Sequence, residues 1–312
     1  MHFHTIHYPK DEIKHRDTAE WWYFNGFLQS KIGQFAYMHT LFRIDLRNAE
    51  YLKLLPLHKK IFNDFYFAHS MLLNLKTNEL KTEIKYHVTP TKESFKQDLL
   101  FFEYDNCELL EKPIFNYFLK NSFVELNLHN KKKPLLENKK GIIKNNKYYT
   151  YYYSLTNLHT VGAIKWKNKL IKVKGKSWHD HQWMNNMQPD VKWDWFSVQL
   201  NNNEEMVVNR MKSSNENNWI IYATMIDKKQ KQKTTHNIIF KPQKTIKLKR
   251  MEYPIYWIIE LPDWKIKLDI KAMHKSQQMD YKLLKYWEGP TKIICTQNKK
   301  KIKGLGFLEM VH

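Results

Sequence analysis

Alternation of apolar and polar residues is the feature that most restricts what this chain can fold into. Between residues 264 and 271 every second residue is apolar and the residues between them are charged, as in an antiparallel strand with one exposed face. Residues 35–46 carry apolar groups on both faces, which indicates a strand covered on both sides. Further runs that favour strands occur near residues 20–28, 65–75, 84–89, 123–129, 148–156, 170–175, 193–200, 205–211, 219–227, 237–240, 245–250, 255–261 and 304–311.

These runs predict an all-β fold of barrels or sandwiches, because little else lies between them. Helical patterning is thin, and its best candidate, residues 92–104, suits a strand equally well. About fifteen strands exceed the roughly eight of one small barrel, so we expect two β-units. The polar run 184–192 is the expected join between them.

The composition is that of a folded protein with an unusual charge. Hydrophobic residues make up 42% of the 312 residues, enough for a substantial buried core. The formal net charge of +21 raises the hypothesis of a nucleic-acid or membrane-surface partner. The lysines are scattered and no nucleic-acid motif is visible, so we predict no specific nucleic-acid partner and leave membrane contact through the basic charge open.

Cysteine use and the N-terminus indicate the compartment. Cys107 and Cys295 lie outside any Cys-x-x-Cys pair, which argues against a disulfide framework and a structural zinc site. The N-terminus lacks the charged start and apolar run of a signal peptide, and no segment is apolar enough to cross a bilayer. We expect a cytoplasmic protein, or an exported one if a leader precedes this sequence.

The stretch richest in chemistry is Gly-Lys-Ser-Trp-His-Asp-His-Gln-Trp at residues 175–183. It sets two histidines and an acid between two indoles: Trp178, His179, Asp180, His181 and Trp183. Indoles exclude water, a carboxylate fixes a histidine tautomer, and the histidine can then exchange a proton near neutral pH. A second stretch, residues 20–23, sets Glu20 directly before three aromatic residues. The functional prediction depends on whether these two stretches meet.

Several motifs in this order match one family. They are residues 8–11 with His15, then residues 20–28, 67–70, 152–158, 175–183, 193–200, 253–257, 286–290 and 304–309. With them the chain resembles, over nearly its whole length, the lipocalin-like family of hydroxyneurosporene synthase (carotenoid 1,2-hydratase) and the AttH-type proteins often labelled predicted secreted hydrolases. The resemblance implies two lipocalin-like antiparallel β-barrel domains packed together, which we expect at residues 1–186 and 187–312.

The resemblance also implies a class of ligand, and this sequence differs from the family pattern at two places. Members of the family act on or bind large hydrophobic molecules such as carotenoids, and related fungal proteins hydrate prenyl groups or guide cycloadditions. The glycine that usually follows Asp-His-Gln-Trp is Met184 here. Carotenoid hydratases carry Tyr-x-Asp on a later strand, whereas residues 207–210 here end in Arg210 and contain no acid.

We therefore predict a protein that binds a hydrophobic small molecule, such as an isoprenoid, polyene or lipid, in an aromatic-lined pocket near the domain junction. The alternative is a carotenoid 1,2-hydratase-like enzyme or a cyclase that acts on such a ligand by acid catalysis. In that case Glu20 or Asp180 would be the acid, raised in pKa by burial, and His181 the proton relay. The ligand-binding candidates are aromatic and histidine side chains: Trp22, His39, His69, Trp178, Trp183, Trp193 and Trp195.

Structural roles compete with each of these assignments. Asp180 and the histidines could simply satisfy buried backbone groups, Glu20 could form an ion pair at a strand start, and most aromatic residues must be core. His179 and His181 could share one face of a strand and bind a metal, but Asp180 could not join them there. We predict no metal and no cofactor, and the absence of a Gly-x-Ser-x-Gly elbow argues against a serine hydrolase.

Overall fold

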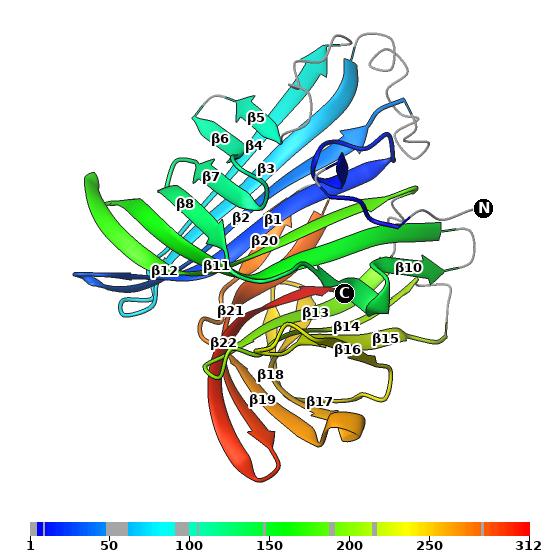
Figure 1. Ribbon diagram of the computed structural model, residues 1–312. Helices are drawn as coiled ribbons and strands as arrows, with labels where there is room; N and C mark the ends of the chain where they lie inside the picture. The colour runs from blue at the N-terminus through cyan, green and yellow to red at the C-terminus, as the bar shows by residue number, and fades with distance from the viewer. Residues whose placement is uncertain are drawn as a thin grey trace. The chain divides into compact units, whose positions relative to one another are not determined.

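The predicted all-β class is confirmed. The computed structural model describes residues 5–8, 10–47, 62–90, 100–104, 106–145, 148–186, 191–213, 217–281 and 284–312, and these form strands joined by turns and three short 3-10 turns (Figure 1). The strands belong to two strongly curled antiparallel half-barrel sheets. The chain divides into two compact units, one of residues 1–136 and 140–187, the other of residues 137–139 and 188–312. No helix in the described ranges has the length and apolar character of a membrane span.

The first unit contains one antiparallel sheet, in the order β4-β3-β2-β1-β12-β11-β8-β7-β6-β5, with β9 and β10 paired to β11. Its strands are β1 (Ala19–Ser30), β2 (Gly33–Asp45), β3 (Phe62–Asn74), β4 (Leu80–Pro90), β5 (Phe101–Tyr104), β6 (Cys107–Glu111), β7 (Asn116–Lys120), β8 (Val124–Asn130), β9 (Leu135–Leu136), β10 (Ile142–Asn145), β11 (Tyr148–Trp166) and β12 (Lys169–Met184). The turns η1 (Lys10–Glu12) and η4 (Glu137–Lys139) complete the described elements up to β12.

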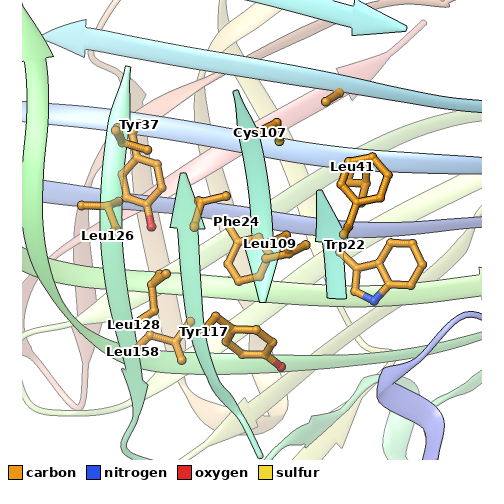
Figure 2. Packing of buried hydrophobic residues seen from close by; sticks show 14 of the residues in the cluster. Trp22, Phe24, Tyr37, Leu41, Cys107, Leu109, Tyr117, Leu126, Leu128 and Leu158 are labelled. Carbon is orange, nitrogen blue, oxygen red and sulfur yellow. The ribbon is translucent and has the colours of Figure 1, made fainter. Parts of the chain in front are cut away.

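The sheet curls until its short strands β5–β8 face its long strands β1–β3. Tyr117 on β7 packs against Phe24 on β1 with ring centroids 5.2 Å apart. Sγ of Cys107 on β6 lies 3.7 Å from Nε2 of His39 on β2. One buried cluster fills the space between these strands, and Figure 2 shows Trp22, Phe24 and Tyr117 within it. We call the side of the sheet that carries this cluster the core face.

The two stretches singled out in the sequence lie side by side. β1 and β12 pair antiparallel over eleven registered positions from Ala19↔Met184 to Gln29↔Lys174. Gly175 is required for this approach, because a Cβ there would lie 1.9 Å from the carbonyl oxygen of Phe27. The 175–183 motif is therefore the second half of one long strand, where the sequence predicted a strand ending near residue 175.

The second unit is built in the same way. Its sheet has the order β16-β15-β14-β13-β22-β21-β19-β18-β17, with β20 paired to β21. The strands are β13 (Val191–Leu200), β14 (Glu205–Ser213), β15 (Ile220–Ile226), β16 (Gln232–Thr235), β17 (Ile239–Leu248), β18 (Met251–Leu261), β19 (Ile266–Ala272), β20 (Gln278–Tyr281), β21 (Leu284–Gln297) and β22 (Lys300–Val311), and η5 (Pro262–Trp264) links β18 to β19. Phe196 and Trp257 meet edge to face in its own buried cluster.

The sequence pattern did not predict the shorter strands or the long strand β21. β5, β6, β7, β9, β10, β16 and β20 are two to five residues long, too short for a period to be recognised. The long strand β21 escaped because Gly289 and Pro290 interrupt it. Residues 101–104 of the helical candidate form β5, while residues 92–99 lie outside the described residues, as do residues 187–190 of the expected join.

Candidate functional site

The pairing of β1 with β12 determines which side chains share the core face. Glu20 is opposite Trp183, Trp22 is opposite His181, and Phe24 is opposite His179. Directly opposite residues of an antiparallel pair project to the same side of the sheet. On the next strand, Tyr153 of β11 is opposite His181. The core face thus collects an acid and two histidines among aromatic rings, from strands about 160 residues apart.

Glu20 is the centre of this group. Its Oε1 accepts hydrogen bonds from Nδ1 of His15 at 2.7 Å and Nε2 of His181 at 2.9 Å. Its Oε2 accepts the backbone N–H of His15 at 3.0 Å and Nη1 of Arg43 at 3.3 Å. Burial alone would raise the pKa of Glu20, but the charge of His15 and the hydrogen bonds from both histidines hold that pKa well below its ordinary value. Glu20 is therefore a carboxylate at neutral pH, and not the proton donor that the sequence suggested.

His15 is the cation of this group. Burial tends to lower its pKa, but the charge of Glu20 and bonds to Asp11 and Glu20 raise it to about 9. Its ring stacks on the Trp183 indole with centroids 3.9 Å apart and planes 4° from parallel. An imidazolium over an indole face gains from the negative charge of the π-system. Because His15 keeps 13% of its side chain exposed, it is the member of the group closest to solvent.

His181 is neutral and connects Glu20 to Tyr153. Burial lowers its pKa, against the hydrogen bond and charge of Glu20, which raise it. Since the Glu20 carboxylate can only accept, Nε2 of His181 carries the proton, and Nδ1 then accepts the hydroxyl of Tyr153 at 3.1 Å. The resulting chain, Tyr153 to His181 to Glu20, can move a proton away from the tyrosine hydroxyl. We call it the Tyr-His-Glu relay.

Arg43 is a positively charged neighbour of Glu20 in the relay. The guanidinium is fully buried, donates from Nε to Asp64 at 2.7 Å and lies 3.5 Å from Asp45 through Nη2. Lys14 pairs with the other oxygen of Asp64 at 2.9 Å. These pairs hold Arg43 beside Glu20, so the orientation of the carboxylate is set from both sides.

Asp180 lies on the opposite face of the sheet. It accepts the Tyr152 hydroxyl and the Trp178 indole N–H, each at 2.6 Å, with a further bond from the Ser154 hydroxyl. Burial raises its pKa to about 7, against the lowering effect of these donors. Because alternate strand residues project to opposite sides, the structure separates Asp180 and Trp178 from Glu20 and His181.

The family of this chain is shown by its match to a family model. A model of the AttH-like family matches residues 2–312. The chain belongs to the AttH-like family.

Solved structures show the same fold at low identity. A protein of Nitrosomonas europaea described as an AttH is 17% identical with a TM-score of 0.83, covering 98% of this chain and 97% of that one. Kievitone hydratase from Nectria haematococca is 14% identical with a TM-score of 0.78, covering 99% and 93%. CghA, crystallised with Sch210972, is 9% identical with a TM-score of 0.63, covering 94% and 88%. No curated protein matches the chain.

The two remaining histidine candidates of this AttH-like protein, His39 and His69, lie on opposite faces of the first unit's sheet. His39 is on the core face opposite Ser70, whose hydroxyl lies 2.9 Å from its Nδ1, and burial lowers its pKa to about 3. It is four positions from Arg43, about 13 Å along β2, so it is not part of the Glu20 group. His69 is on the opposite face between Phe42 and Phe67, and burial lowers its pKa to about 3.

Trp193 and Trp195 belong to the second unit of the AttH-like protein. They alternate along β13 with Phe196 and Val198 of that unit's buried cluster, so they project to the other side of their sheet. Trp193 donates its indole N–H to Glu309 at 3.3 Å. Both indoles therefore lie outside the buried cluster of their own unit.

Arg210, which stands where carotenoid hydratases carry an acid, is ion-paired. Its Nε donates to Oδ2 of Asp194 at 2.6 Å, and His312 Nε2 lies 2.8 Å from the other oxygen. The guanidinium also lies over the rings of Trp219 and Trp257. Asp194 therefore has a partner within hydrogen-bond distance at each of its oxygens.

The Glu20 group meets the distance requirement of a metal site. Ligand atoms of His15, Glu20 and His181 lie within 4.8 Å of one another. However, Oε1 of Glu20 already accepts a hydrogen bond from each imidazole, and the Arg43 guanidinium lies 3.3 Å from Oε2. A second cation there would be repelled by Arg43 and would have to displace the proton of His15. We therefore interpret the group as a proton-handling network.

Sequence reasoning missed three members of this network. His15 entered only as part of a motif, Arg43 as a strand residue, and Tyr153 within the 152–158 motif. The alternation of β2 and β11 places Arg43 and Tyr153 on the same face as their β1 and β12 partners. That relation requires the order of the strands in the sheet, which one sequence does not contain.

Proposed function

We propose that this AttH-like protein is an enzyme that hydrates or cyclises a hydrophobic small molecule by acid–base catalysis on the core face of its first unit. The observation that carries the proposal is the Tyr-His-Glu relay. It joins a hydroxyl, a neutral imidazole and a carboxylate in hydrogen-bond contact, beside the Trp22 and Trp183 rings. Such a chain can take the proton of a water molecule that attacks the substrate.

The surroundings suit a cationic intermediate. Protonation of a carbon–carbon double bond leaves a carbocation, which aromatic faces stabilise through their quadrupoles. Trp22 stacks 5.0 Å from His181, and Tyr153 is edge-on to it at 5.5 Å. A cation formed against these rings would lie next to the relay that removes the proton of the attacking water.

The similar structures support a reaction of this kind. Kievitone hydratase carries the activity in its name, and CghA was crystallised with the compound Sch210972. Both share the fold with this chain at low identity, so they support the class of ligand and reaction, and not a particular substrate.

The test is incubation of the purified protein with lycopene, squalene and a prenylated isoflavonoid in water enriched in oxygen-18. A product that has gained labelled water supports a hydratase, and an isomer of unchanged mass supports a cyclase. Tyr153→Phe and His181→Gln should lower the rate about 10²–10⁴-fold, whereas Asp180→Asn should leave it within about threefold. Binding of a probe without any product would instead support a protein that only binds its hydrophobic ligand.

A further inference from the structure

The core face of the first unit carries a second buried acid, Glu12. This residue ends η1 and is fully buried. Its Oε2 accepts the Tyr117 hydroxyl at 2.6 Å, and its backbone oxygen accepts the Trp22 indole N–H at 3.1 Å. Its other carboxyl oxygen, Oε1, has no hydrogen-bond partner among the described residues. No ion pair in the described part of the chain joins Glu12 to a cation.

The groups that face Glu12 favour its neutral form. Burial is the largest effect, and the nearby carboxyls of Glu111 and Asp11 add to it, so the pKa of Glu12 is raised well above its ordinary value. The hydrogen bond from Tyr117 opposes this shift only in part. Since the Tyr117 hydroxyl occupies Oε2, the proton of the acid belongs on Oε1, the oxygen without a partner.

Other unpartnered polar atoms surround the same tyrosine. Glu111 is the cross-strand partner of Tyr117, and the His179 ring lies 4.8 Å from the Tyr117 ring. Oε2 of Glu111 and Nε2 of His179 are buried and have no partner among the described residues. A buried polar atom without a partner destabilises the folded protein unless a water or ligand group meets it. Glu12, Glu111 and His179 thus each bring a buried polar atom without a partner in the described ranges to the neighbourhood of Tyr117.

Glu12 and Glu20 are both connected to the side chain of Trp22. The Trp22 ring stacks on His181, which is hydrogen-bonded to the Glu20 carboxylate, while the Trp22 N–H donates to the backbone oxygen of Glu12. Glu20 has two histidines and Arg43 as neighbours, whereas Glu12 has a tyrosine and further carboxyls. Two carboxyls in such opposite environments divide the roles of acid and base between them.

We propose that Glu12 is the proton donor of the site and protonates an electron-rich carbon–carbon double bond of a hydrophobic substrate held against Trp22, Phe24 and Tyr117. This rests on the proposed function. The O–H bond of Glu12 breaks and a C–H bond forms, which leaves a carbocation and the Glu12 carboxylate. Water adds to the cation, its extra proton passes to the Tyr-His-Glu relay and from there returns to Glu12 through solvent. The net change is alkene plus water to alcohol.

Infrared difference spectroscopy tests the protonation state without any substrate. At pH 7 the wild type should show the carbonyl band of protonated Glu12 together with a partial band from Asp180, and Glu12→Gln should remove only the Glu12 band. Asp180→Asn is the matched control, because the Asp180 band disappears above about pH 7 while the Glu12 band remains. Tyr117→Phe keeps the acid but removes its donor, so it should move the band to higher frequency. If Asp180→Asn shows no carboxylic-acid band at pH 7, or if Glu12→Gln leaves the spectrum unchanged, the proposal is overturned.

Turnover tests the catalytic role with the same labelled-water assay. Glu12→Gln keeps the shape and the Tyr117 bond, so it should lower kcat about 10²–10⁴-fold with KM changed less than about threefold. Addition of lycopene, squalene or the prenylated isoflavonoid should also shift the Glu12 band when the probe binds, even if no product forms. Full turnover in Glu12→Gln overturns Glu12 as donor and leaves the proposed function standing. Absence of turnover in the wild type, with the Glu12 band present and shifted by a probe, contradicts the proposed function alone.

Discussion

Nε2 of His181 lies 2.9 Å from Oε1 of Glu20, although 161 residues separate the two in the chain. The contact exists because β12 returns to pair with β1 in a register that sets Trp22 opposite His181. It makes one hydrogen-bonded system of the two stretches that the sequence suggested as functional. The direction of each pKa in that system then decides which member can hold a proton.

Removal of the Glu20 charge should reduce both activity and stability. Glu20→Gln leaves the shape unchanged but takes one counter-charge from buried Arg43 and His15, so the free energy of unfolding should fall by about 3 kcal/mol. Turnover of any probe accepted by the wild type should fall about 10²–10⁴-fold. Urea denaturation and the labelled-water assay measure the two effects. Glu79→Gln, at a half-exposed ion pair with Lys167, is the control and should change stability by less than about 0.5 kcal/mol.

Stability should fall between about pH 6.5 and pH 9 because of His15. Its folded pKa is raised to about 9, above the value near 6.5 of an unfolded histidine. The stabilisation is therefore complete below about pH 6.5 and is lost as the pH rises through 9, with a size of about 1–3 kcal/mol. Denaturation at pH 6, 7.5 and 9 should show this slope in the wild type. If His15→Gln shows the same slope, His15 is not its source.

Asp180 should make the free energy of unfolding depend on pH in a lower pH range than His15 does. Its folded pKa is raised to about 7 from an ordinary value near 3.9, so its contribution is present below about pH 4 and is lost as the pH rises through 7. In Asp180→Asn the free energy of unfolding should change less with pH over this range than it does in the wild type. Because Asp180 is on the face opposite Glu20, the variant should keep its turnover. A loss of activity equal to that of Glu20→Gln would contradict the division between the two faces.

The indole of Trp183 should help to keep His15 charged. Trp183→Leu removes the stacked ring, and the loss of about 0.5–2 kcal/mol of cation–π attraction should lower the pKa of His15 by about 0.4–1.5 units. Titration of the His15 ring followed by NMR measures the change. Trp178→Leu, on the other face of β12, is the matched control and should leave that titration where it is.

Chelation should not affect the protein if the Glu20 group handles protons. Treatment with EDTA should leave stability and turnover unchanged, and elemental analysis should find well below one metal ion per chain. The physical reason is the Arg43 guanidinium, 3.3 Å from Glu20, together with the proton on His15. A rise in melting temperature on addition of Zn²⁺ that disappears in His15→Gln would show that the group binds metal instead.

The sequence by itself determined the strand-rich class and the two β-units, and it singled out the two stretches that the fold then pairs. These follow from local pattern: alternation such as that of residues 264–271, and the dense order of Trp178, His179, Asp180, His181 and Trp183. Alternation also anticipated that Asp180 would project away from its histidine neighbours. Such properties depend only on residues close together in the chain, so one sequence contains them.

Only the tertiary structure decided the members of the site and their charges. His15, Arg43 and Tyr153 come from different elements and reach Glu20 and His181 only through the order and register of the strands. The same packing places cations around Glu20, which lower its pKa, and buries Glu12 beside other carboxyls, which raises its pKa. A carboxyl in the sequence has no fixed proton affinity, because burial and neighbouring charges set it after the chain has folded.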